Sequence, residues 1–294
     1  PPERTEDVME IRPFFDPDTW TLTYVVHEDG VGVVIDSVLD YDPASGRTST
    51  RAVDEVSRYI DAQRLDVPYV LDTHAHADHL SAMHVLRERT GARTVIGDGI
   101  QGVQETFKKI FHLGDEFAPD GSQFDILMKG GESLQAGPLV IEALHTPGHT
   151  KACLTYKIGD ALFVGDVLFQ PDYGTARADF PGGSADELFD SVQQLYALPG
   201  EMRVFTGHDY QPDGRPLEFE STIAAQRDHN VQLTQATSRS EFVSFREARD
   251  AELDVPRLIL PSVQVNIRAG QLPEPESDGV SYLKIPMNVI GGEK

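Results

Sequence analysis

The chain has very few of the residues that stabilise secreted or membrane-bound proteins. Among its 294 residues there is one cysteine, Cys153, so no disulfide can form within the chain. A single thiol is typical of a reducing compartment. No uninterrupted apolar run approaches the roughly 18 residues of a membrane-spanning helix, and residues 1–15 contain no signal-peptide stretch. We therefore expect a globular cytoplasmic protein, whose first residue, Pro1, leaves N-terminal processing open.

Positive charge is also scarce. The sequence has 25 Lys and Arg against 48 Asp and Glu, a formal net charge of −23. Such a surface repels phosphate backbones and anionic lipids, which argues against nucleic-acid and membrane partners. A small anionic substrate is still compatible with this charge, because one local basic pocket can override the average field.

The order of expected strands and helices predicts one large α/β domain. A β hairpin is expected around Asp29-Gly30, helices at 51–64, 80–89 and 101–111, and a strand at 67–73. A β meander at 132–167 is followed by a helix at 184–197, a strand at 203–206, and helices at 218–233 and 240–253. Two sheets packed face to face with helices outside would bury both groups of strands. A doubly wound sheet competes, but no glycine-rich phosphate loop follows the first strand.

A dense histidine cluster follows the strand at 67–73. The run reads THAHADH and contains His74, His76, Asp78 and His79 within six residues. Residues two apart on an extended segment point to the same side, so His74 and His76 can face one centre. Imidazole and carboxylate are ligands of zinc, iron and manganese. A solvated strand-to-helix loop capped by Asp78 is the other interpretation, but three imidazoles in so short a run favour a metal site.

Three further polar residues follow expected strands. His149, Asp166 and His208 each lie just after a strand, where loops carry reactive groups. Asp166 alone could be a turn residue and His208 alone a surface residue, but together with the first cluster they indicate one metal-binding rim. Cys153 is interpreted as a core residue. The sequence does not decide whether His145 belongs to the site or only ends a strand. The remaining histidines are treated as structural or exposed: His27, His84, His112 and His229.

At this point the residues resemble a known signature. The run HAHADH (74–79), followed by His149, Asp166 and His208, is similar to the metal-binding motif of the metallo-β-lactamase superfamily over residues 73–210. The resemblance implies a four-layer αββα sandwich with the metal at one edge. It does not define the reaction, because this fold hosts hydrolases, nucleases, redox enzymes and dioxygenases.

Further stretches resemble the persulfide dioxygenases of the bacterial glutathione-persulfide type. They are LDTHAHADH (71–79), HTPGHT (145–150), RADF (177–180), TGHDY (206–210) and LPSVQVNIR (260–268). The resemblance runs nearly the whole chain and implies one Fe(II) per chain, bound by His74, His149 and Asp166. Two histidines and a carboxylate are the ligand set of non-haem iron oxygenases. His76, Asp78, His79 and His208 would surround the iron or form a second metal site.

The resemblance also implies the substrate and its contacts. The expected reaction converts glutathione persulfide, O2 and water to glutathione and sulfite. In related hydroxyacylglutathione hydrolases a Gly-Cys-Gly-Lys stretch binds glutathione; here GTAR (174–177) takes its place, so Arg177 is expected to bind a carboxylate unless Asp179 neutralises it. Tyr173 is a weaker candidate for the same pocket. Tyr210 is expected to donate a hydrogen bond at the reacting sulfur or oxygen, or else to pack as an ordinary aromatic.

Several alternatives remain open from the sequence. The same residues suit a binuclear zinc hydrolase of a glutathione thioester, with Asp166 bridging a first ion on His74, His76 and His149 and a second on Asp78, His79 and His208. A non-catalytic metal or persulfide sensor is a third interpretation. We expect one domain over 1–294 with no rhodanese domain, residues 211–294 completing it as helices and a tail. That tail packs either on its own domain or on a second chain of a homo-oligomer.

Overall fold

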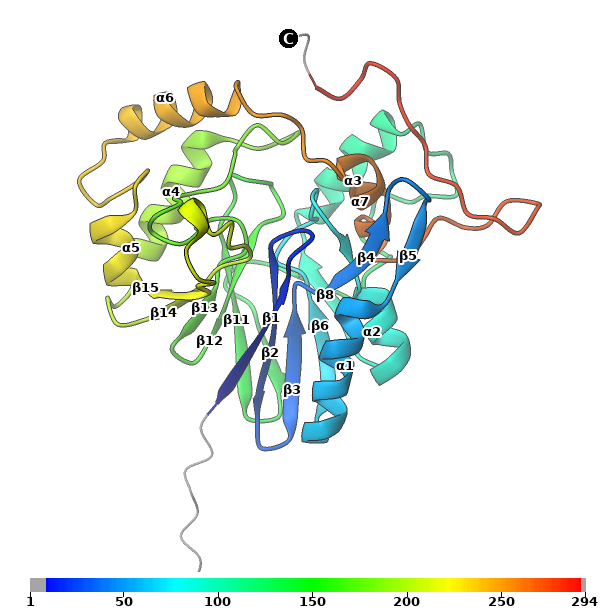
Figure 1. Ribbon diagram of the computed structural model, residues 1–294, viewed down its shortest axis with the longest axis horizontal. Coiled ribbons are helices and arrows are strands. Elements are labelled where there is room, and N and C mark those ends of the chain that lie inside the picture. Colours follow the sequence, from blue (N-terminus) through cyan, green and yellow to red (C-terminus); the bar gives the residue numbers. More distant parts are fainter. Residues whose placement is uncertain (1–8, 292–294) are drawn as a thin grey trace, which may run out of the picture.

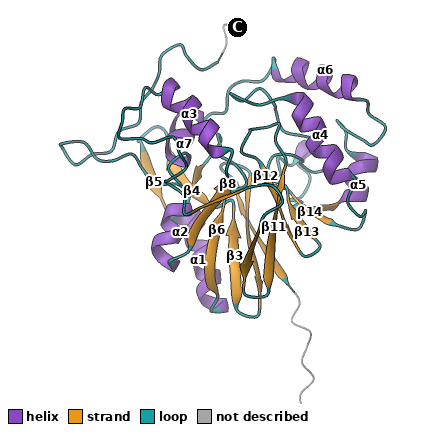
Figure 2. Cartoon of the chain, turned by 180° about the vertical axis from the view of Figure 1, so that it is seen from behind, coloured by secondary structure: helices purple, strands orange, loops and turns teal. Residues whose placement is uncertain are grey.

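The computed structural model describes residues 9–291, which form two β sheets packed face to face between outer helices (Figures 1 and 2). This confirms the expected four-layer αββα sandwich. Within the described residues no helix has the length and apolar character to cross a membrane. The first eight residues, on which the expectation of no signal peptide partly rests, lie outside the described part.

The first sheet has six strands in the order β1-β2-β3-β6-β8-β9. Its N-terminal strands are antiparallel, whereas β3, β6, β8 and β9 run parallel. Asp29 and Gly30 both have positive φ and form the tight turn between β2 and β3, as the sequence predicts. The strands are β1 (Glu10–Asp16), β2 (Thr21–Glu28), β3 (Val31–Ile35), β6 (Asp66–Leu71), β8 (Arg93–Gly97) and β9 (Ile126–Met128).

The second sheet has six strands in the order β10-β11-β12-β13-β14-β15 and is also mixed, because β13 and β14 are parallel. A small third sheet of β5, β4 and β7 lies beside the first. The second sheet's strands are β10 (Ser133–Ala136), β11 (Leu139–His145), β12 (Leu154–Ile158), β13 (Ala161–Phe163), β14 (Arg203–Phe205) and β15 (Glu220–Thr222). The third sheet's strands are β4 (Val38–Asp42), β5 (Arg47–Ser49) and β7 (Leu80–Ser81).

Helices cover the outer face of each large sheet. α1 (Arg51–Gln63), α2 (Met83–Thr90) and α3 (Ile100–Ile110) cover the first sheet. α4 (Ala185–Tyr196), α5 (Ile223–His229) and α6 (Arg239–Asp250) cover the second, and α7 (Ile259–Asn266) returns to the first. The buried face of α1 is formed by Val53, Val56 and Ile60, as its spacing predicts.

The core has three layers, one between the sheets and one under each set of helices. Tyr24, Phe163 and Phe205 pack edge to face and stacked between the two sheets, with ring centroids 5.2–5.6 Å apart. This aromatic cluster joins the first sheet to the second. It therefore fixes the relative position of the strand ends that carry the candidate ligands.

Two expected elements differ in the structure. The helix expected at 80–89 begins only at Met83, because Leu80 and Ser81 pair with β4. The helix expected at 218–233 is replaced by β15 and the shorter α5, because residues 220–222 pair with β14. In both places an open strand edge supplies hydrogen bonds that outweigh local helix propensity. The expectation of a single domain completed by residues 211–294 stays a prediction.

Candidate metal centre

The histidine loop lies at one edge of the sandwich, where β6 ends. Asp36, at the end of β3, accepts hydrogen bonds from the Thr73 backbone N–H at 2.7 Å and from its hydroxyl at 2.9 Å. From the other side the Asn266 side chain donates to the carbonyl oxygens of His76 and His79, both at 2.8 Å. The loop is therefore held between the first sheet and α7, and its side chains face the interior.

Three chain segments bring together a first ligand group of His74, His149 and Asp166, which follow β6, β11 and β13. Their candidate ligand atoms all lie within 4.8 Å of one another. The Nε2 atoms of both histidines are 3.7 Å from Asp166 Oδ2. The three side chains, which the sequence predicts to meet, thus lie close enough together to bind the same metal ion.

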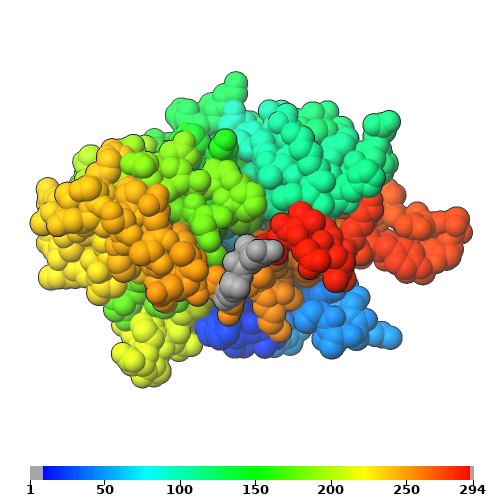
Figure 3. Space-filling view, turned by 90° about the horizontal axis from the view of Figure 1, so that it is seen from above, coloured from blue at the N-terminus to red at the C-terminus, as the bar shows by residue number. Residues whose placement is uncertain are grey.

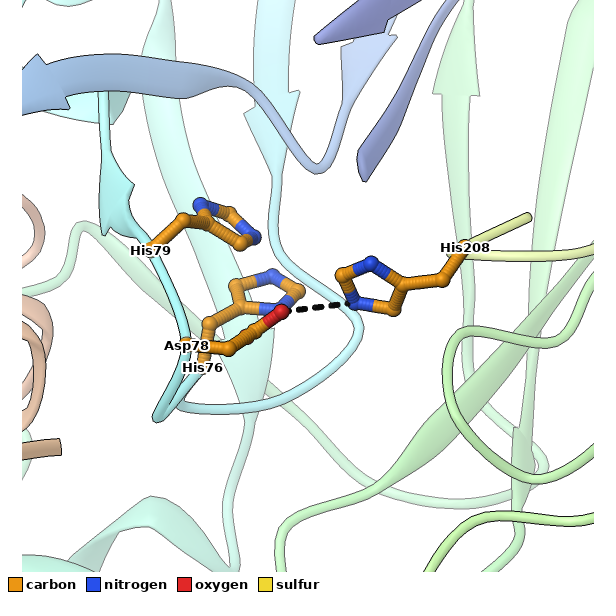
Figure 4. Close-up of side chains that lie close together, drawn as sticks. All are labelled: His76, Asp78, His79 and His208. Carbon is orange, nitrogen blue, oxygen red and sulfur yellow. Dashed lines mark ion pairs between the residues drawn. The ribbon is translucent and has the colours of Figure 1, made fainter. Parts of the chain in front are cut away.

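A second ligand group adjoins the first and contains His76, Asp78, His79 and His208 (Figure 4). His208 Nε2 lies 3.2 Å from Asp78 Oδ2 and 3.4 Å from Asp166 Oδ1. The two oxygens of Asp166 therefore face different groups, Oδ2 the first and Oδ1 the second. A carboxylate placed in this way can bridge two ions or serve one.

Each of the five histidines has one ring nitrogen held by the protein. The partners are Thr73 Oγ1 for His74, Asp36 for His76, the Leu80 carbonyl for His79, the Arg177 carbonyl for His149 and Thr21 Oγ1 for His208. The opposite nitrogens of His74, His76 and His79 are buried without a hydrogen-bond partner, and so are one oxygen of Asp78 and one of Asp166. Unpaired buried polar atoms are costly, and this pattern of one held and one free nitrogen is that of metal-ligating histidine. The residues thus fit one or two metal ions.

The electrostatics of the loop favour a neutral imidazole at His74 and His79 and a protonated one at His76. Burial, followed by the charge of His76, holds the pKa of His74 well below its ordinary value. Burial likewise lowers the pKa of His79 to about 3. At His76 burial opposes protonation, but the charge and hydrogen bond of Asp36 outweigh it and raise the pKa to about 10. A metal ion must therefore displace a proton from His76 but not from His74 or His79.

A cavity of about 380 Å³ opens onto both ligand groups. One wall is aromatic: the Tyr173 and Tyr210 rings stack at 4.7 Å, and Trp20 lies 6.1 Å from Tyr210. Burial, and after it the charges of Asp78 and Asp166, raises the pKa of Tyr210 well above its ordinary value. Its hydroxyl therefore stays protonated and remains a hydrogen-bond donor at neutral pH.

Both predicted substrate contacts, Tyr173 and Arg177, line this cavity. Tyr173 is part of the aromatic wall. The Arg177 guanidinium donates to both oxygens of Asp179 at 2.6 and 2.8 Å and to the Asp254 carbonyl at 2.6 Å. The alternative considered from the sequence, an ion pair with Asp179, is thus formed, and substrate binding by Arg177 stays a prediction.

Sequence analysis missed three residues that organise the centre. Asp36 follows a strand just as Asp166 does, so the same strand-end argument could have identified it. Asn266 lies in a stretch used only for the resemblance, and nothing in its sequence neighbourhood indicates its contacts. Arg246 is buried on α6 and forms an ion pair with Asp250. Asp250 in turn accepts a hydrogen bond from the Ala178 N–H, next to the Arg177 carbonyl that accepts from His149. By contrast His145 is exposed and outside both groups, and Cys153 is buried.

Comparison with known proteins agrees with this geometry. The family model described as the metallo-β-lactamase superfamily matches residues 21–208. The chain is 49% identical to a probable metallo-hydrolase of Burkholderia pseudomallei over 96% of this chain and all of the relative, and 44% identical to glyoxylase B2 of Dictyostelium discoideum over 96% and 97%. It spans 66% of a β-lactamase hydrolase-like protein of Agrobacterium fabrum, at 48% identity over 97% of this chain.

A solved structure, ETHE1 from Myxococcus xanthus, superposes with a TM-score of 0.72 at 32% identity, covering 90% of this chain and all of that one. The family match covers more than half of the chain and includes every residue of both ligand groups. The chain therefore belongs to the metallo-β-lactamase superfamily.

Proposed function

We propose that this metal-dependent enzyme of the metallo-β-lactamase superfamily acts at the sulfur of a glutathione conjugate, by hydrolysing a thioester at a two-metal centre. The observation that carries the proposal is the position of Asp166, whose Oδ2 faces His74 and His149 of the first ligand group while its Oδ1 faces His208 of the second. The names of a probable metallo-hydrolase and a glyoxylase among relatives at 44–49% identity support hydrolysis. The glutathione thioester itself comes from the resemblance described for the sequence.

The chain's own residues have defined roles in this proposal. His74, His76 and His149 would hold one ion, Asp78, His79 and His208 the other, and Asp166 would bridge them. His76, described above with the second group, is assigned to the first ion because its ring centroid lies 4.2 Å from that of His74 as well as from that of His79. Bound by these residues, two divalent ions would supply an activated water near neutral pH and would polarise the thioester carbonyl. The protein orients each imidazole through its held nitrogen, and Tyr210 offers a hydrogen bond at the cavity wall.

Persulfide dioxygenation is the second candidate, and a specific observation favours it. His74, His149 and Asp166 form a group without His76, whose Nε2 instead contacts Asp36 Oδ1 at 3.0 Å. Two histidines and one carboxylate are the ligands of mononuclear Fe(II) oxygenases. The chain also matches human mitochondrial persulfide dioxygenase ETHE1 at 29% identity over 88% of both proteins. The reaction would convert glutathione persulfide, O2 and water to glutathione and sulfite.

Metal content and two assays separate these candidates. Protein purified without added metal is analysed for zinc and iron, then tested for hydrolysis of a glutathione thioester and for oxygen uptake with glutathione persulfide. Two zinc ions per chain with thioester hydrolysis support the first proposal. One iron per chain with oxygen uptake overturns it in favour of the dioxygenase.

A variant of the second ligand group sharpens the comparison. Asp78→Asn removes a ligand that only the two-metal centre requires, and His145→Gln, at an exposed histidine outside both groups, is the matched control. Hydrolysis at two metals predicts that Asp78→Asn loses one ion per chain and most thioester turnover. Unchanged metal content and turnover in Asp78→Asn would contradict it.

A further inference from the structure

Four arginines line the cavity above the ligand groups, in a chain with 23 excess negative charges. Two of them are neutralised within the protein. Arg246 is buried and pairs with Asp250 at 2.7 Å, and Arg177 pairs with Asp179. Their charges are therefore already compensated before any ligand enters.

The other two, Arg249 and Arg257, have no comparable partner among residues 9–291. Arg249 lies in the last turn of α6, and Arg257 lies just before α7; both side chains are exposed. Neither forms an ion pair with any residue in the described part of the chain. Asp18, an acid that shares this rim, lies 2.8 Å from Arg51, which also pairs with Asp16 and Asp40. Figure 3 shows orange C-terminal residues beside dark-blue N-terminal residues on this face of the molecule.

The helix dipole explains only one of these cations. An arginine in the last turn of α6 is favourable beside the helix C-terminus, so Arg249 alone needs no ligand. Arg257 lies outside the helices, so no helix dipole stabilises its charge. Both line, from different segments, the same cavity as Trp20, Tyr173 and Tyr210, and Arg257 also borders a second hollow that Asp16, Asp18 and Asp40 line.

We propose that Arg249 and Arg257 form the anion-binding rim of the substrate cavity and bind the carboxylates of the substrate while its sulfur end reaches the ligand groups. The substrate class is then a small thiol conjugate carrying at least one carboxylate. This inference rests on the proposed action at a glutathione conjugate. It assigns the contact to two arginines that are free to bind, rather than to Arg177.

The test measures binding of glutathione, which both proposed substrates contain, to metal-loaded protein by calorimetry. Arg249→Gln, Arg257→Gln and the double variant are compared with Arg58→Gln, an exposed arginine on α1 whose nearest acid, Glu55, is 4.0 Å away. Glutathione diethyl ester, which lacks both carboxylate charges, is titrated in parallel.

Each single variant should weaken glutathione binding about fivefold, and the double variant about 25-fold, because exposed charge pairs contribute up to about this much each. The ester should bind wild-type protein more weakly than glutathione, and this difference should disappear in the double variant. Arg58→Gln should bind as wild type does.

Two results would overturn the inference in distinguishable ways. If wild-type protein binds glutathione and the double variant binds it equally well, the rim is wrong but the proposed function stands. If wild-type protein does not bind glutathione at all, the glutathione-linked function fails together with the rim.

Discussion

At the residue scale, the centre is defined by what each histidine does with its two nitrogens. Five imidazoles have one nitrogen fixed by a protein oxygen, and the other directed toward Asp166, toward Asp78 or left unpaired. The residue types could be predicted from the sequence, because three histidines within six residues at a strand end strongly favour a metal site. Asp36 and Thr73, which fix two of the rings, could be found only by extending the strand-end argument to single polar residues, which are common at such positions.

Asp166 should matter to both ligand groups at once. Asp166→Asn removes one charge that faces His74, His149 and His208, so metal affinity should fall by at least tenfold at every occupied position. Metal content after dialysis against a weak chelator measures this, with His145→Gln as the control. Full metal retention in Asp166→Asn would show that this carboxylate is not a ligand.

The single thiol should be inert in the folded protein. Burial raises the pKa of Cys153 from 9.0 to about 12, so thiolate is scarce at neutral pH and the sulfur is inaccessible. Ellman's reagent at pH 8 should therefore react with Cys153 only after unfolding in urea. The thiol of the unfolded chain loses its proton near pH 9 and that of the folded chain only near pH 12, so folding becomes less favourable as the pH rises between these values. The rate at which Ellman's reagent labels Cys153 without urea should therefore increase between pH 9 and 12. Rapid labelling of native protein at pH 8 would contradict this.

At the element scale, segments far apart in the sequence meet at one edge of the sandwich. The helix expected at 51–64 follows from local spacing and is present as α1. The helix expected at 184–197 is present as α4, whose N-terminus is capped by Ser184, a residue type that favours this position. α7 could not be predicted, because nearly all its residues are buried and it therefore shows no amphipathic period. Pro261 lies in the first turn of α7, where proline is compatible with a helix, but in the sequence alone a proline predicts the end of a helix.

The link from α7 to the metal loop is open to a direct test. Asn266→Ala removes bonds to the His76 and His79 carbonyls and to the Ser81 N–H, all buried, so the unfolding free energy should fall by about 3 kcal/mol. Metal affinity should fall with it, because the loop loses its support. Denaturant unfolding and metal titration measure both effects.

The matched control lies in the same C-terminal region. Gln271→Ala changes an exposed amide beyond α7 and should leave stability within about 0.5 kcal/mol of wild type. If Asn266→Ala behaves like Gln271→Ala, then α7 does not hold the loop. An intact fold with weakened metal binding would be the clearest sign of a positioning role.

At the scale of the whole molecule, the fold class could be predicted because two runs of strands and their flanking helices allow few ways to bury every apolar face. The order of strands within each sheet could not, because pairing across the sandwich depends on contacts distant in sequence. The net charge, too, can be read from the sequence, whereas the positions of the individual charges in the fold cannot. The value of −23 predicts repulsion of polyanions, but only the structure places at one cavity two arginines, Arg249 and Arg257, that have no ion-pair partner within residues 9–291.

Metal removal should destabilise the whole chain. Because the free ligand atoms are buried, the native state binds metal and the unfolded chain does not hold the site together. At free metal a thousandfold above the dissociation constant, binding adds about 4 kcal/mol to the unfolding free energy. Thermal melts of metal-loaded, chelator-treated and reloaded protein should show a lower Tm only after chelation. An unchanged Tm would argue against a buried metal centre.

The aromatic wall has one more consequence, which is experimental. Trp20 is the chain's single tryptophan, it is 45% exposed, and it borders the cavity beside Tyr210. Indole emission from this molecule therefore comes entirely from the mouth of the cavity. Any compound that enters should change that emission, so occupancy can be followed optically in solution without a label.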